Sequence, residues 1–123
     1  KVMTRFQLFA WNSVRFRNEV YKNAKIDLTD TDNETLYTVP AVTTAIVKSI
    51  LVSEDSGNTP NITVTLVDSS AAVFSLFKSK ALTANGTLEL LSAPLVMEES
   101  EILKVEASTG NQLHVVMSIL EIS

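Results

Sequence analysis

Few side chains in this sequence could carry out acid–base or metal chemistry, and they are widely spaced. The only histidine is His114, in the stretch Leu113-His114-Val115. Imidazole can act as a general base or bind a metal ion. However, the chain offers no second nitrogen ligand, no cysteine and no serine motif of the form G-x-S-x-G. We therefore interpret His114 as an ordinary strand residue, and we expect no catalytic site and no enzymatic activity.

Acidic side chains gather in two places, where they could bind a hard cation such as Ca²⁺. The first group is Asp27, Asp30, Asp32 and Glu34. An EF-hand loop needs glycine at its sixth position and glutamate at its twelfth. Counted from Asp30, those positions hold Thr35 and Ala41. We interpret the group as a polar turn before a strand that starts at Leu36.

The second acidic group is Glu98, Glu99 and Glu101. We interpret it as a solvated connection between strands, and a cation-bridged subunit contact is the alternative. No metal site and no cofactor are therefore expected.

The elements that would position these side chains are predicted to be β-strands. Apolar and polar residues alternate in a series of short segments separated by turn residues such as Asn85-Gly86. The segments are 23–28, 36–39, 44–53, 62–66, 72–77, 87–90, 103–107 and 113–119. No helical period separates them, and the spacing is typical of sandwiches and barrels. We predict an all-β, jelly-roll-like antiparallel β-sandwich of about eight strands with an N-terminal arm.

Charge divides the chain into two predicted parts, an arm at residues 1–25 and a sandwich domain at 26–123. The arm has six basic residues and one glutamate, a net charge of +5, while the remainder has four lysines and thirteen acids, a net charge of −9. The arm is also rich in aromatic side chains, which favour contact with protein over exposure to water. The predicted interface residues are Phe6, Phe9, Trp11, Arg15, Phe16, Arg17 and Tyr21.

Composition favours partners that are proteins. Hydrophobic residues make up 46% of the chain, and the mean hydropathy is +0.20. Both values are high for a small monomer, so we predict a homo-oligomer. The arm packs on its own sandwich or reaches a neighbouring copy, and its charge favours the neighbour. Arg15 and Arg17 could instead contact phosphates, but the acidic body opposes nucleic acid. No apolar run approaches the ~20 residues that span a bilayer, so we expect no membrane partner.

Several segments resemble small tailed-phage virion proteins. They are Leu36-Tyr37-Thr38-Val39-Pro40-Ala41, Thr44-Ala45-Ile46-Val47-Lys48-Ser49-Ile50-Leu51-Val52, Ala84-Asn85-Gly86-Thr87-Leu88-Glu89-Leu90-Leu91 and Ile102-Leu103-Lys104-Val105-Glu106-Ala107. The resemblance covers about residues 26–122 and omits the arm. It implies a β-sandwich structural subunit of a bacteriophage particle.

From this resemblance and the arm we expect a capsid decoration (cement) protein, with a homotrimer as the favoured oligomer. Its partners would be the major capsid protein or other virion proteins, and its location the virion, assembled in the host cytoplasm. A neck, tail or fibre-attachment protein is the first alternative. A glycan-binding module of a receptor-binding tip is the second, and it requires exposed aromatic side chains on strand loops, with Tyr37 and the 54–58 loop as the positions to test.

Overall fold

The computed structural model describes residues 18–123, which form nine β-strands and no helix. The strands are β1 (Glu19–Leu28), β2 (Glu34–Thr38), β3 (Thr44–Glu54), β4 (Asn61–Val67), β5 (Val73–Ala81), β6 (Thr87–Glu89), β7 (Leu95–Met97), β8 (Ile102–Ala107) and β9 (Leu113–Ile122). Within these residues no helix exists that could cross a membrane.

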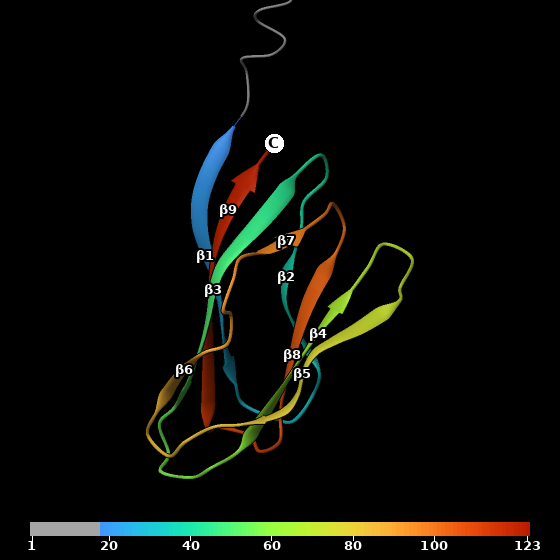
Figure 1. The fold of residues 1–123 in the computed structure, drawn as a ribbon. Coiled ribbons are helices and arrows are strands. Elements are labelled where there is room, and N and C mark those ends of the chain that lie inside the picture. The colour runs from blue at the N-terminus through green and yellow to red at the C-terminus, as the bar shows by residue number, and fades with distance from the viewer. Residues whose placement is uncertain (1–17) are drawn as a thin grey trace, which may run out of the picture.

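The strands form two antiparallel sheets that face each other (Figure 1). One sheet has the order β1-β9-β3-β6, with β7 also pairing with β3. We call it the β1 sheet. The other has the order β2-β8-β4-β5 and is called the β2 sheet. Because the chain passes repeatedly from one sheet to the other, the arrangement is the jelly-roll-like antiparallel sandwich that the sequence predicted.

The core lies between the inner faces of the two sheets. Alternate residues point inward, so the period-2 pattern of the sequence becomes one apolar layer. Ile50 and Met117 of the β1 sheet, and Ile62 and Leu103 of the β2 sheet, have no exposed surface. Burying a side chain of this size contributes ~1.5–3 kcal/mol, so this layer is the main source of stability.

Two strands differ from their predicted form. β7 was missed because its three residues, which follow Pro94, are too few to display an alternation. β5 extends past its predicted end to Ala81 and has two register shifts against β4. One shift lies near Ser79, whose backbone has a φ of 51°. Such bulges bend an edge strand and reduce its ability to pair with other chains.

The division expected between residues 25 and 26 falls inside β1. This strand begins at Glu19 and pairs with β9 in continuous register from Glu19↔Ile122 to Leu28↔Leu113. Residues 19–25 are therefore part of a sandwich sheet. A separate arm formed by the residues before Asn18 stays a prediction.

Candidate functional site

Most of the predicted interface residues lie outside the described part of the chain. These are Phe6, Phe9, Trp11, Arg15, Phe16 and Arg17. Only Tyr21 can be placed. It lies in β1, on the outer face of the β1 sheet, and 74% of its surface is exposed.

The described chain begins at one end of the sandwich, which we call the Ser123 end. Asn18 and Ser123 exchange two backbone hydrogen bonds of 2.9 Å, which fix the start of the described chain at this end. Beside it lies an open hollow of about 560 Å³. Its lining residues are Val42, Thr43, Thr44, Glu98, Glu99, Ile122 and Ser123. The hollow thus combines aliphatic and acidic side chains.

Val42 is the most exposed large hydrophobic residue at this end, with 79% of its surface accessible. Its φ of 55° is rare for a β-branched residue. The backbone N–H of Val42 donates a hydrogen bond of 2.6 Å to Glu99 Oε1, which helps to hold this conformation. The Glu98–Glu101 connection therefore stabilises the backbone at Val42, in addition to joining two strands as expected.

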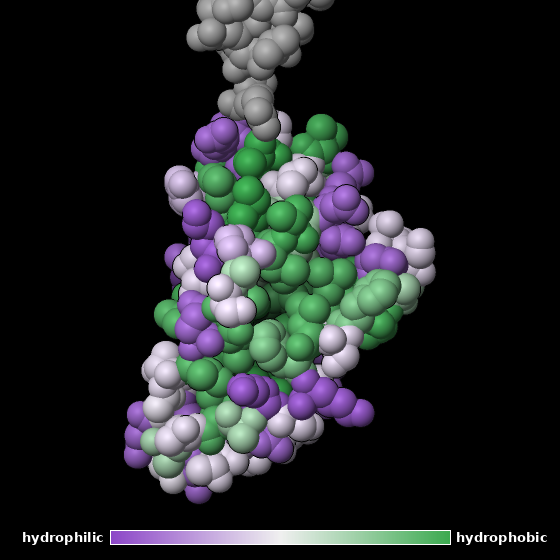
Figure 2. Space-filling view, viewed as in Figure 1, coloured by the Kyte–Doolittle hydropathy of each residue, from purple (hydrophilic) through white to green (hydrophobic). Residues whose placement is uncertain are grey.

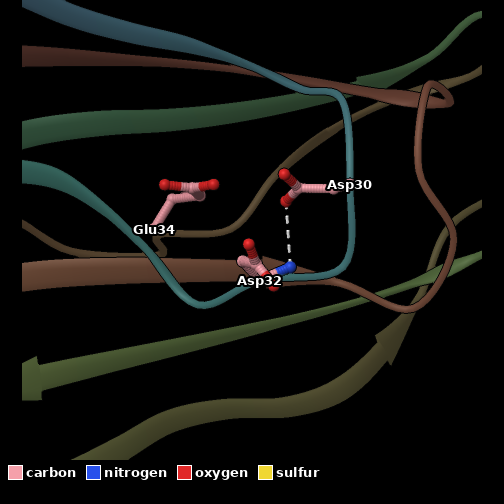
Figure 3. Close-up of side chains that lie close together, drawn as sticks. All are labelled: Asp30, Asp32 and Glu34. Carbon is pink, nitrogen blue, oxygen red and sulfur yellow. Dashed lines mark hydrogen bonds between the residues drawn. The ribbon is translucent and has the colours of Figure 1, made fainter.

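The first acidic group is divided by the fold. Carboxylate oxygens of Asp30 and Asp32, in the β1–β2 loop, and of Glu34, the first residue of β2, lie within 4.8 Å of one another (Figure 3). Asp30 Oδ1 accepts a hydrogen bond of 2.9 Å from the backbone N–H of Asp32, the geometry of a polar turn. Burial, and then the charge of Asp30, raise the pKa of the Glu34 carboxyl. Asp27 lies elsewhere, in β1.

His114 has acidic partners that the sequence did not reveal. Its Nε2 lies 3.3 Å from Asp27 Oδ1, and its Nδ1 lies 3.5 Å from Asp55 Oδ2. Ser53 is its cross-strand neighbour on β3. Because both ring nitrogens face carboxylates, neither is directed at the Ser53 hydroxyl, as nucleophile activation would require. The arrangement links β1, β9 and the loop after β3, and it does not form a hydrolytic triad.

Glu54 is the one buried charged side chain among residues 18–123, with 2% of its surface exposed. Its carboxylate accepts backbone hydrogen bonds from Ser56 (3.1 Å), Gly57 (3.0 Å), Asn58 (3.3 Å) and Asn85 (2.9 Å). The Ser56 hydroxyl also donates to it. All of these donors belong to two loops, so Glu54 holds the loops together and is not directed at a ligand.

An apolar groove runs along the open edge of the sandwich, between β5 and the β6–β7 connection. Apolar side chains gather down the middle of the face shown in Figure 2. The groove has a volume of about 280 Å³. It is lined by Leu76, Phe77, Leu90, Leu91, Ser92, Ala93, Pro94 and Leu95. It contains no titratable side chain, which makes it unsuitable for acid–base chemistry.

Tyr37 does not offer the exposed aromatic surface that the glycan-binding alternative requires. It is 8% exposed, and its hydroxyl donates a hydrogen bond of 2.5 Å to Glu121. Among the described aromatic residues, Tyr21 and Phe74 are the exposed large ones, and they lie in strands β1 and β5. This placement argues against a glycan platform on the described loops.

Comparison with known proteins gives a fold but no family. No protein-family model and no curated protein matches the sequence. A protein of the Bacillus endospore appendages, described as disulfide-linked pili, matches with a TM-score of 0.52 and 11% identity, over 85% of this chain and 88% of that chain. This likeness supports the sandwich fold alone.

Viral capsid proteins also appear among the solved structures. The protein of infectious bursal disease virus T=1 particles has a TM-score of 0.49 and 12% identity, over 88% of this chain and 31% of that chain. This chain thus spans about a third of that protein. The cyanophage Pam1 capsid asymmetric unit gives a TM-score of 0.44 and 17% identity, over 86% of this chain and 85% of that chain. The structural neighbours therefore include viral capsid and pilus proteins.

Proposed function

We propose that this protein is a structural subunit of a bacteriophage virion, and specifically a capsid decoration (cement) protein. In this role the sandwich is a rigid body, and residues 1–17 attach it to the particle. Binding energy gained at the particle surface would stabilise the head by mass action. The partners would be the major capsid protein and further copies of this chain, with a trimer on the capsid as the favoured oligomer.

The observation that carries the proposal is the position of the chain start. Asn18 is fixed to Ser123, beside the hollow that contains Glu98 and Glu99. Residues 1–17 have four basic side chains and no acid, whereas residues 18–123 have six lysines and fourteen acids. A basic, aromatic segment is thus joined to an acidic body, and the Ser123 end of a neighbouring copy offers it a complementary surface. Aromatic and arginine side chains are common anchors of such contacts.

The fold supports this role indirectly. The endospore appendage protein is described as part of disulfide-linked pili. This chain has no cysteine, so copies of it cannot be joined by disulfides. A segment of seventeen residues could span up to ~55 Å when extended, which is enough to reach an adjacent subunit.

Deletion of residues 1–17 tests the attachment. This deletion stops short of β1, which a longer one would damage. The deleted protein should stay folded but no longer cosediment with particles that lack the native protein. Trp11→Ala combined with Arg15→Ala should weaken binding in the full chain, while Thr35→Ala, on the polar outer face of the β2 sheet, serves as the control. Unchanged binding by the deleted protein would contradict the proposed attachment.

Copy number separates decoration from the neck, tail or fibre alternative. A decoration protein is distributed over the whole head, whereas a tail component occurs in a few copies at one vertex. Quantitative mass spectrometry of intact particles, calibrated against the major capsid protein, distinguishes the two. A low copy number would move the protein to the tail and leave its structural role intact.

A further inference from the structure

The two outward faces of the sandwich differ in chemistry. On the β2 sheet, one row that crosses all four strands consists of Thr35, Lys104, Thr65 and Ser75. On the β1 sheet, the corresponding row consists of Tyr21, Leu120, Ile46 and Val96. Every member of the Tyr21 row is apolar or aromatic, and Tyr21 and Val96 are 74% and 58% exposed.

A second row of the β1 sheet has charges at its two ends. It consists of Lys25, Val116, Leu51 and Glu89. The inner pair is aliphatic, with Val116 and Leu51 each about 40% exposed. A basic side chain therefore lies at the β1 edge and an acidic one at the β6 edge. The β2 sheet has a row with three apolar members at its Ser123 end, consisting of Thr38, Ile102, Val67 and Val73.

We propose that the outer face of the β1 sheet is a twofold contact surface, and that it binds the same face of a second copy of this chain. The axis would run parallel to the strands, between β9 and β3. Rotation about this axis reverses the order of the strands in the partner copy. Each row of residues keeps its position along the strand direction, so a row faces the same row of the partner. Tyr21 then faces Val96 of the partner copy, Leu120 faces its Ile46, and Val116 faces its Leu51.

The charges of the Lys25 row fit this symmetry. In the same arrangement Lys25 faces Glu89 of the partner copy, and the pair occurs twice, once on each side of the apolar centre. Glu89 is held in position, because it accepts a hydrogen bond of 2.8 Å from the backbone N–H of Ile50 and another from the Ser49 hydroxyl. These hydrogen bonds outweigh the effect of burial and lower the pKa of Glu89, so its carboxylate is charged at neutral pH.

The area of the face is sufficient. β1 and β9 have ten residues each, β3 has eleven, and β6 and β7, which share the fourth position, have three each. With ~4.8 Å between strands and ~3.3 Å per residue, these strands cover roughly 590 Å² per copy. The two copies together would bury about 1,200 Å², at the lower end of the ~1,200–2,000 Å² typical of specific interfaces.

A second copy fits this face better than residues 1–17 do. Within the Lys25 row, the two charges have opposite signs and face each other under rotation. The segment 1–17 has only basic charges, so it could neutralise Glu89 but would leave Lys25 without a partner. Its complement is the Ser123 end, where Glu98 and Glu99 lie. The contact therefore does not depend on the proposed attachment to particles.

Engineered cysteines test the contact in the full chain, which has none of its own. We use the double variant Tyr21→Cys with Val96→Cys. Within one copy these positions are three strand spacings apart, ~14 Å, too far for a disulfide, which needs Cα atoms within ~7 Å. The matched control, Thr35→Cys with Ser75→Cys, has the same spacing on the β2 sheet.

Mild oxidation should convert most of the first variant into covalent dimers and leave the control as single chains on a nonreducing gel. Tyr21→Cys alone should also stay single, because Tyr21 does not face itself across the axis. No dimer from the double variant, or equal dimer from the control, would overturn the proposal. The absence of a dimer from the double variant is also the result expected if residues 1–17 cover the face.

A charge variant gives a second, noncovalent test. Lys25→Glu places an acidic side chain opposite Glu89 of the partner copy, once on each side of the contact. Like charges across an interface cost several kcal/mol. The dimer dissociation constant measured by sedimentation equilibrium should rise at least about tenfold. Lys104→Glu, on the other face, is the control and should leave the constant unchanged. Equal effects of the two variants would contradict the assigned face.

Discussion

At the scale of single residues, Glu54 shows most clearly how the fold changes the chemistry of a side chain. Burial alone would raise the pKa of its carboxyl, but the backbone N–H of Asn85 and hydrogen bonds from Ser56 and Asn58 lower it to about 2. The carboxylate joins the loop after β3 to the Asn85 turn before β6. A side chain that resembles a solvated turn residue in the sequence is therefore the centre of a hydrogen-bond network.

This pKa predicts a loss of stability in acid. The usual value of 4.5 is lowered to about 2, so the unfolded chain takes up this proton first as the pH falls. The contribution of Glu54 to the free energy of unfolding is complete above the unfolded pKa and disappears as the pH approaches the folded one. Urea unfolding midpoints measured between about pH 7 and about pH 3 should therefore decline more in the wild type than in Glu54→Gln.

Glu54→Gln should also be less stable than the wild type at neutral pH, because an amide replaces a carboxylate that accepts from several N–H groups. Glu106→Gln, at an exposed position of β8, is the control and should keep both the wild-type stability and its slope with pH. Parallel pH profiles for wild type and Glu54→Gln would show that the carboxylate is not the titrating group.

At the scale of strands, a hydrogen-bonded group connects the two sheets near the Ser123 end. Glu121 of β9 accepts from the Tyr37 hydroxyl of β2, and Lys22 Nζ of β1 lies 3.3 Å from the same carboxylate oxygen. Burial, followed by the hydrogen bond to Glu121, raises the pKa of the Tyr37 hydroxyl, so it stays a donor. Lys22, which the sequence assigned to the docking arm, instead contributes to contacts within the sandwich.

Tyr37→Phe should destabilise the fold by about 1–2 kcal/mol, because it removes a hydrogen bond to a partly buried carboxylate. The free energy of unfolding in urea measures the effect. The chain has one other tyrosine, Tyr21, which is largely exposed, so Tyr21→Phe is the matched control and should change stability little. If Tyr37→Phe has no effect in a Glu121→Ala background, which lacks the acceptor, the coupling lies in this contact. A full effect in that background would exclude it.

How far the elements could be predicted depended on strand length and position. Central strands such as β3 and β9 are long enough for their alternation to show in the sequence. β7 is too short, and the bulges of β5 come from its edge position, which a one-dimensional pattern does not contain. β1 was divided in two because charge and hydropathy change within it, although its pairing with β9 is continuous.

At the scale of the whole molecule, the sandwich was predictable and its surfaces were not. The outer row of Tyr21, Leu120, Ile46 and Val96 joins four strands that lie far apart in the sequence. The acidic partners of His114 come from β1 and from the loop after β3, for the same reason. Only the strand order brings such sets together, and that order cannot be deduced from alternation alone. The predicted anchors between Phe6 and Arg17 remain a prediction.

The stability of the sandwich without residues 1–17 decides whether this segment packs on its own subunit or reaches a neighbour. Every buried hydrophobic residue described lies between Leu28 and Ile119. We therefore expect the deletion to shift the thermal midpoint of unfolding by less than about 2 °C, equivalent to less than about 0.5 kcal/mol. Scanning calorimetry measures this midpoint, and a single unchanged transition would mean that any loss of particle binding is a loss of contact.

A larger fall in the midpoint would mean that Phe6, Phe9 and Trp11 cover apolar surface on their own sandwich. The groove beside β5 is then the natural place to search, because it is lined by apolar residues such as Leu76 and Phe77. Protein concentration separates the two cases. If residues 1–17 contact their own subunit, they stabilise the full chain equally at every protein concentration. If they contact a neighbour, the thermal midpoint of the full chain rises with protein concentration, and the midpoint of the deleted chain depends on concentration less.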